Sequence, residues 1–223
     1  MNLFEHTLYI NLDSRTDRRA HAEEEFKKMN ITAERVSGTK MANGAVGCTL
    51  SHIKCLELAK KRKYSHVFIC EDDIHFTNAE VLKTNVAKFI TNCDFTWNML
   101  IIGGNNVPPY ITLNDYSVRI FECQTTTGYV VHENYYNTLI ANFKESVDKL
   151  MRTSNNKMYS LDIYWKRLQK QDFWFMIIPP TVSQYESYSD IEERVVNYDR
   201  LMLDMDKEWL MQRLQMQKMQ FNS

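Results

Sequence analysis

Three consecutive acids, Glu71, Asp72 and Asp73, carry the strongest chemical signal in the sequence. Adjacent carboxylates repel one another, so their position directly after an apolar run is costly unless they share a cation. Alternation along an extended chain places Glu71 and Asp73 on one side and Asp72 on the other. Two such carboxylates form a clamp for a hard ion such as Mn²⁺ or Mg²⁺. The alternative is an acidic strand exit that caps the next helix at Asn78.

A basic cluster near the beginning of the chain consists of Arg15, Arg18 and Arg19. Ser14 and Asp17 have capping-box spacing, which predicts a helix start that places these arginines in its first turns. The helix dipole favours an anion there, and arginine binds phosphate bidentately. The alternative is pairing with nearby acids, namely Asp13, Asp17 and Glu23. Because the arginines and the acidic triplet should meet at one sheet edge, the sequence predicts a diphosphate-metal crevice.

The elements that must position these side chains alternate between strands and helices. Apolar runs predict strands at 7–12, 31–36, 67–70, 98–102, 117–121, 128–131 and 173–178. Helical spacing predicts helices at 14–29, 47–63, 80–90, 134–151, 160–170 and 198–220. The segment 181–197 has little periodicity, so we expect a mobile flap there. This order favours an α/β sandwich in which 67–70 is a central parallel strand that ends at the acids.

Composition excludes several functional classes. The chain has 223 residues, 44% of them hydrophobic, which is enough for one domain with a substantial core. A net charge of -1 gives no general attraction for nucleic acid or anionic lipid. The first residues lack a secretory pattern and no apolar run approaches the ~20 residues of a membrane span, so we expect a soluble, cytoplasmic protein. Five scattered cysteines are expected to be reduced core thiols.

Three blocks in the first third of the chain resemble glycosyltransferase family 25. They are 8–19, 44–52 and 67–73, and they occur in the family's order and at similar spacing. This family includes lipooligosaccharide galactosyltransferases and the collagen galactosyltransferase group. Shorter likenesses follow at Thr126–Val131, Ser160–Asp162, Pro179–Gln184 and Ser189–Ile191.

The resemblance implies a GT-A-like (Rossmann-like) αβα sandwich with a mixed, mostly parallel central sheet. It also implies a UDP-sugar donor and inversion at the anomeric carbon. Asn11 and Arg15 would then contact the nucleotide, and Ser51 and His52 would line the donor pocket. The other residues expected to contribute to donor binding are Arg18, Asp72, Gly128 and Gln184.

The acidic triplet would take the place of the Asp-x-Asp metal motif of such folds. Asp73 is the first choice as the ligand of Mn²⁺ or Mg²⁺, and Glu71 is the second. His75 and His132 are further candidates, but a lone histidine is a weak signal.

Inverting transfer needs a carboxylate base on the face opposite the leaving diphosphate. Asp162 is our candidate because a helix start after a polar loop exposes it toward a pocket. The alternative is an ordinary first-turn acid that stabilises its helix. Glu186 and Asp190 are rivals, since they lie in the flap that would exclude water from the donor.

We therefore expect an inverting, metal-dependent glycosyltransferase that moves a galactose- or glucose-type hexose from a UDP-sugar to a hydroxyl acceptor on a glycan or protein. Residues 1–198 would form the catalytic domain. The helix expected within 199–223 would pack on that domain or form a homodimer. The alternatives are a nucleotidyltransferase that makes the nucleotide-sugar and a catalytically silent relative that only binds donor. The former usually has a Gly-rich first loop, which Asp13–Thr16 lacks.

Overall fold

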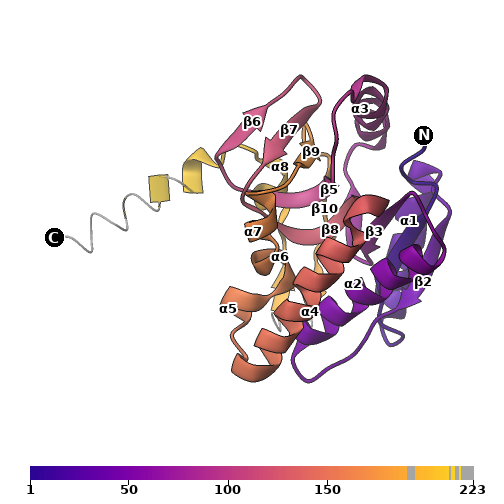
Figure 1. The fold of residues 1–223 in the computed structure, drawn as a ribbon, viewed down its shortest axis with the longest axis vertical. Helices are drawn as coiled ribbons and strands as arrows, with labels where there is room; N and C mark the ends of the chain where they lie inside the picture. Colours follow the sequence, from indigo (N-terminus) through magenta and orange to yellow (C-terminus); the bar gives the residue numbers. More distant parts are fainter. Residues whose placement is uncertain (190–193, 211, 214–215, 217–223) are drawn as a thin grey trace.

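A central sheet of eight strands organises the protein in a computed structural model that describes residues 1–189, 194–210, 212, 213 and 216 (Figure 1). The strands lie in the order β2-β1-β3-β8-β5-β9-β7-β6. Their bounds are β1 Thr7–Asn11, β2 Ala33–Ser37, β3 His66–Glu71, β5 Met99–Asn106, β6 Tyr110–Thr112, β7 Ser117–Ile120, β8 Cys123–His132 and β9 Trp174–Ile177. Two short strand pairs flank this sheet: β4 Ile74–Phe76 with β10 Val182–Gln184, and β11 Ser187–Ser189 with β12 Arg194–Val196.

The sheet is mixed, and most of its strands share one direction. The pairs β1–β2, β1–β3 and β5–β9 are parallel, whereas β3–β8, β5–β8, β7–β9 and β6–β7 are antiparallel. Only β7 and β8 therefore run against the other strands of this sheet. The expected α/β sandwich with a mixed, mostly parallel central sheet is confirmed.

Alternation along the central strands divides the core into two layers. In β3, Val67 and Ile69 face one layer, and Phe68 and Cys70 face the other; all four are fully buried. Strand β5 repeats the pattern over Met99–Ile102. Because both faces are buried, the strands read as continuous apolar runs, which explains why the sequence predicts them well.

Helices cover both faces of the sheet. On one face α2 (Gly44–Lys61) and α4 (Tyr136–Thr153) lie side by side (Figure 1). On the other face lie α1 (Thr16–Met29) and α3 (Ala79–Asn92). The remaining helices are short: η1 Glu133–Tyr135, α5 Asn156–Tyr159, α6 Leu161–Tyr164, α7 Lys166–Gln169 and α8 Asp199–Leu203. Among the described residues, none of the helices combines the length and apolarity that crossing a bilayer requires.

The first helix does not begin with the expected capping box. Helix α1 begins at Thr16, and its N-cap residue Arg15 makes no capping bond through its side chain. The carboxylate of Asp17 instead accepts hydrogen bonds from Arg15 Nε at 3.1 Å and Nη2 at 3.0 Å. An ion pair between neighbouring residues thus replaces the cap that the spacing of Ser14 and Asp17 suggested.

Two segments in the second half of the chain differ in secondary structure from the expectation. The expected helix 160–170 divides into α6 and α7 at Trp165, whose buried indole donates to the Cys123 carbonyl at 2.9 Å. The segment 181–197 contains β10, β11 and β12 rather than only irregular chain. These strands have three residues each, which is too short to show a period of two.

The expected terminal helix 198–220 is not continuous. Helix α8 ends at Leu203, and the Asp204 carboxylate then accepts hydrogen bonds from the backbone N–H groups of Asp206 and Lys207, both at 3.1 Å. Such a side-chain bond competes with helix continuation and begins a new turn. Helical backbone returns at 208–210, 212–213 and 216, and the rest of the expected helix lies outside the described residues.

The loop after β2 is fixed against α2 by a close approach of two backbones. A Cβ on Gly47 would lie 2.3 Å from the Thr39 carbonyl oxygen, so only glycine fits here. Next to it, Ser51 Oγ accepts from the Thr39 N–H and donates to the Gly47 carbonyl, both at 2.8 Å. This contact places the loop 38–42 at the sheet edge where the candidate site lies.

Candidate functional site

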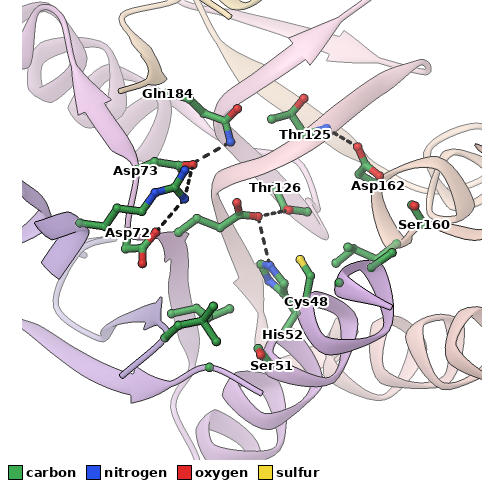
Figure 2. A pocket seen from close by; sticks show the side chains of 18 of the residues that line it. Cys48, Ser51, His52, Asp72, Asp73, Thr125, Thr126, Ser160, Asp162 and Gln184 are labelled. Carbon is green, nitrogen blue, oxygen red and sulfur yellow. Dashed lines mark hydrogen bonds and ion pairs between the residues drawn. The ribbon is translucent and has the colours of Figure 1, made fainter. Parts of the chain in front are cut away.

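A cavity of about 560 Å³ opens at the edge of the sheet where β1, β3 and β5 end and β8 begins. Its lining includes Arg15, Arg18, all three acids of the triplet, and Asp162. Figure 2 shows Asp72, Asp73 and Gln184 on one side of the cavity and Asp162 and Ser160 on the other. The arginines and the acids therefore share one cavity, as the fold of a doubly wound sheet predicts.

Arg18 joins α1 to the acidic turn. Its Nη1 lies 3.2 Å from Asp72 Oδ1 and 3.0 Å from Asp73 Oδ2, and its Nη2 donates to Ser187 Oγ at 2.8 Å. The expected alternation, with Asp72 pointing away from Asp73, is wrong. Strand β3 ends at Glu71 and the chain turns at Asp72, so both aspartates reach the same guanidinium.

Glu71 lines the cavity between the acidic turn and β8. Its Oε1 accepts a short hydrogen bond from Thr126 Oγ1 and lies 3.4 Å from His52 Nε2. The other ring nitrogen of His52, Nδ1, lies 2.7 Å from the hydroxyl oxygen of Tyr129. His52 is fully buried, so it holds Glu71 in place from inside the core.

The acidic cluster carries more negative charge than its protein partners balance. Burial and the neighbouring Glu71 raise the pKa of Asp73 to about 7, despite the opposing effect of Arg18. Burial also raises the pKa of Asp72, although Asn11 and Arg18 counteract it. For Glu71 the hydrogen bond and charge of His52 outweigh burial, so its pKa is lowered. A group in this cavity that carries positive charge would relieve the repulsion.

Asp162 occupies the opposite wall. Its Oδ2 accepts a hydrogen bond from the backbone N–H of Thr125 at 3.0 Å. Burial raises the pKa of Asp162, which makes it a stronger base than a solvated carboxylate. Thr125 has φ of 74°, a left-handed conformation that is costly for a β-branched residue, and this backbone is what presents the N–H to Asp162.

The other predicted arginines have different surroundings. Arg15 lines the cavity while it pairs with Asp17 at 3.0 Å. Arg19 pairs with Glu23 at 2.8 Å on the exposed face of α1 and does not line the cavity. For Arg19 the alternative of a surface ion pair is therefore the better interpretation.

Several predicted binding residues line the cavity. Gln184 lies beside the turn, with its Nε2 3.4 Å from Asp73 Oδ1. Ser51 and His52 also line the cavity, although the hydroxyl of Ser51 is already bonded to the loop backbone.

Two predicted donor-binding residues do not line the cavity. Asn11 is buried, and its Nδ2 donates to Asp72 Oδ2 at 2.7 Å and to the Arg15 carbonyl at 2.9 Å. It therefore positions the site rather than contacting a ligand. Gly128 is a packing residue, because a Cβ there would lie 3.1 Å from Ile74 Cδ1.

The rival bases are poorly placed or outside the described chain. Glu186 is exposed and accepts a hydrogen bond from Asn197 Nδ2 at 2.7 Å. Asp190 lies outside the described residues. Because Glu186 does not line the cavity, Asp162 is the better placed of these two.

Sequence reasoning missed other cavity residues, above all Cys48, Asn105, Tyr198 and Leu201. Asn105 is buried, and its Oδ1 has no hydrogen-bond partner among the described residues. Cys48 lies in the block 44–52, yet its residue type alone predicts a core thiol. Asn105 follows an apolar run, as the three acids do, so the sequence contained a signal that could have predicted its place at the cavity.

The residues fit a divalent cation by charge more than by ligand geometry. Among the described residues, Cys48, His52 and Glu71 have ligand atoms within 4.8 Å of one another, whereas the acidic triplet does not form such a group. Burial holds the pKa of Cys48 well above its usual value, and both His52 nitrogens have partners. Carboxylates such as those of Glu71 and Asp73 are the type of ligand that a hard ion prefers.

The family is decided by the comparison of sequences. The family model described as "Glycosyltransferase family 25 (LPS biosynthesis protein)" matches residues 32–151, which is more than half of the chain. The chain belongs to glycosyltransferase family 25. The match covers two of the three blocks that carried the resemblance, 44–52 and 67–73 with the acidic triplet. The block 8–19, which contains Arg18, and Asp162 lie outside it.

A putative glycosyltransferase from Haemophilus influenzae is similar to this family 25 chain. The two sequences are 33% identical in a region that covers 33% of this chain and 34% of the relative. The chain therefore matches about a third of the relative's length.

Two solved structures are more distantly similar. One is a glycosyltransferase involved in the glycosylation of the major capsid of PBCV-1, with 10% identity over 78% of this chain and 92% of that chain and a TM-score of 0.43. The other is a mannose-1-phosphate geranyltransferase from Thermus thermophilus, with 9% identity over 78% of this chain and 58% of that chain and a TM-score of 0.41. Likenesses this distant assign no function to the chain.

Proposed function

We propose that this family 25 chain is an inverting, metal-dependent hexosyltransferase. It would take a galactose- or glucose-type sugar from a UDP-sugar and transfer it to a hydroxyl on a glycan or protein. The observation that carries this proposal is the position of Asp162 across one cavity from Asp73 and Arg18 (Figure 2). Inversion requires a base and a leaving group on opposite faces of the sugar, and carboxylate and guanidinium groups on opposite walls are consistent with this requirement.

The diphosphate would lie on the side of Arg15 and Arg18. Both residues line the cavity, and the planar fork of arginine suits phosphate oxygens. Asp73, with Glu71 beside it, would hold Mn²⁺ or Mg²⁺. The ion would neutralise the charge that develops on the diphosphate as it leaves.

The sugar would then lie between the two walls. Asn105 offers a buried amide oxygen that has no hydrogen-bond partner among the described residues, which suits a sugar hydroxyl. Asp162 would accept the proton of the attacking hydroxyl, since its raised pKa favours proton uptake. Tyr198 and Leu201 also line the cavity and would help to exclude water.

The experiment is a screen of UDP-sugars with and without Mn²⁺, in which UDP release is measured. We expect metal-dependent release from at least one UDP-hexose, and an Asp73→Ala variant should lose at least about 100-fold in rate. The control is Asp115→Ala, since Asp115 is an exposed acid that pairs with Lys88 at 3.1 Å. Turnover that survives Asp73→Ala would contradict the proposed metal role.

Two other outcomes would identify the alternatives. Synthesis of a nucleotide-sugar from a sugar phosphate and a nucleoside triphosphate would indicate a nucleotidyltransferase. Tight donor binding without UDP release, with a range of hydroxyl acceptors present, would indicate a silent relative.

A further inference from the structure

A second group of metal-ligating side chains lies on the outer side of the acidic turn. His21 and Glu25 are one helical turn apart on α1, and His75 lies on β4. Their ligand atoms lie within 4.8 Å of one another. None of the three lines the cavity, so this group is separate from the site described above.

Glu25 is the centre of the group. Only 2% of it is exposed, which is unusual for a glutamate on a surface helix. Its Oε2 accepts the backbone N–H of Phe76 at 2.9 Å, and its Oε1 lies 3.2 Å from His75 Nδ1. Two ligands on a tetrahedral ion with bonds of about 2.1 Å would be about 3.4 Å apart, so this pair already has the required separation.

The His21 ring is held in one orientation. Its Nε2 lies 2.9 Å from the carbonyl oxygen of Ile74, and its ring stacks on Tyr185 with centroids 4.1 Å apart. A carbonyl only accepts, so Nε2 carries the hydrogen and Nδ1 keeps the lone pair of the neutral ring. A hydrogen bond from one ring nitrogen to a backbone carbonyl is the common support of a ligating histidine.

We propose that His21, Glu25 and His75 bind a Zn²⁺ ion, with water as the fourth ligand. Two imidazoles and one carboxylate suit zinc, whereas Mg²⁺ and Mn²⁺ prefer oxygen ligands. Lys28 also donates to Glu25 Oε1, but its side chain is 49% exposed and moves into solvent when the ion binds.

The ion would brace the turn that carries the acids. His75 follows Asp73 by two residues, and the Tyr185 N–H donates to the Asp73 carbonyl at 2.6 Å. His21 lies one turn after Arg18 on α1. Zinc would therefore tie α1 to β4 and fix the helix that presents Arg18 to the acids. This site does not depend on the proposed function.

The test is the zinc content of the purified full-length chain after incubation with ZnSO₄ and dialysis, together with its melting temperature. We expect one zinc per chain and, at a zinc concentration about 100-fold above Kd, a rise in melting temperature of roughly 5–10 °C. His21→Ala and His75→Ala should each abolish both effects. The matched control is Cys48→Ala, which removes a ligand from the other metal-type group and should keep both.

Three results would overturn the proposal. They are the absence of zinc from the wild-type chain, zinc retained in both histidine variants, and zinc lost only in Cys48→Ala. Circular dichroism checks that each variant is folded. The side chain of His75 is 34% exposed, so His75→Ala is expected to fold. Its zinc content tests the proposal if His21→Ala does not fold. Because no donor is used, failure of this test leaves the transferase proposal intact.

Discussion

Burial and the neighbouring Glu71 raise the pKa of Asp73 from an ordinary value of 3.8 to about 7, so in the metal-free protein this carboxyl titrates near neutral pH. Between these two values the folded chain binds a proton that the unfolded chain does not. The free energy of unfolding should therefore fall as pH rises from about 4 to about 7. Asp73→Asn removes the charge and should flatten this dependence.

The size of the effect has an upper bound. One pKa unit corresponds to about 1.4 kcal/mol. Above pH 7, the free energy of unfolding of Asp73→Asn should therefore exceed that of the wild type by at most ~4 kcal/mol. Urea unfolding at pH 5 and pH 8, with a chelator present, measures the difference. An equal pH slope in both proteins would show that Asp73 is not the titrating group.

Asp162 has a different role in this account, since it acts on the acceptor rather than on the donor. Asp162→Asn should lower kcat for transfer by about 10²- to 10⁴-fold, which is the usual loss for a general base. The calorimetric Kd for UDP should stay within about twofold, because Asp162 lies across the cavity from Asp72 and Asp73, which Arg18 contacts.

Asp148→Asn is the control for this prediction, because Asp148 is an exposed acid that pairs with Arg152 at 2.8 Å. Full activity in Asp162→Asn would contradict the role of Asp162 as the base.

Residue types indicated which side chains line the cavity better than how those side chains are arranged. The triplet and Arg18 stand out because strand ends and basic residues are visible in sequence. The contact of both Asp72 and Asp73 with Arg18 is not visible in the sequence. Side chains alternate between the two sides only within a strand, and β3 ends at Glu71. The packing role of Gly128 depends on Ile74, a contact between distant segments that no local pattern reveals.

At the scale of elements, the segment after β12 is anchored by a buried lysine. Lys207 is fully buried, and its Nζ donates to the carbonyl of Asn106 and, at 2.8 Å, to that of Asp204. Burial lowers the pKa of Lys207. Because Tyr198 and Leu201 line the cavity, this anchor also fixes one of its walls.

Lys207→Met keeps much of the length of the side chain but removes both hydrogen bonds of the amine. We expect a loss of about 2–3 kcal/mol in unfolding free energy, because two buried carbonyls lose a charged donor. The KM for the donor should rise as the wall loosens. Chemical denaturation and steady-state kinetics measure the two effects, and Lys157→Met, at an exposed lysine, is the control. Unchanged stability and KM would contradict the anchoring role.

The long elements followed from the sequence and the short ones did not. Strands such as β3 and β5 are apolar over most of their length, so their pattern is decisive. Strands β4 and β10 have three residues each and form by pairing with each other across more than a hundred positions of chain. In the expected terminal helix the apolar periodicity continues past Leu203, but Asp204 interrupts it by bonding to the following backbone.

At the scale of the whole molecule, the order of strands brings the site together. Strand β1 lies between β2 and β3, so the arginines that follow β1 and the acids that follow β3 meet at one edge. The antiparallel strand β8 begins at the same edge. There the backbone N–H of Thr125 donates to Asp162, and the hydroxyl of Thr126 donates to Glu71.

We propose that a cation at Asp73 and the guanidinium of Arg18 together bind a diphosphate in this cavity. Anomalous diffraction from crystals grown with UDP and Mn²⁺ tests it most directly. We predict a manganese peak between the Asp73 carboxylate and the diphosphate, with Arg18 in contact with phosphate oxygens and Asp162 on the opposite wall. Manganese remote from Asp73, or UDP bound outside the cavity, would contradict the account.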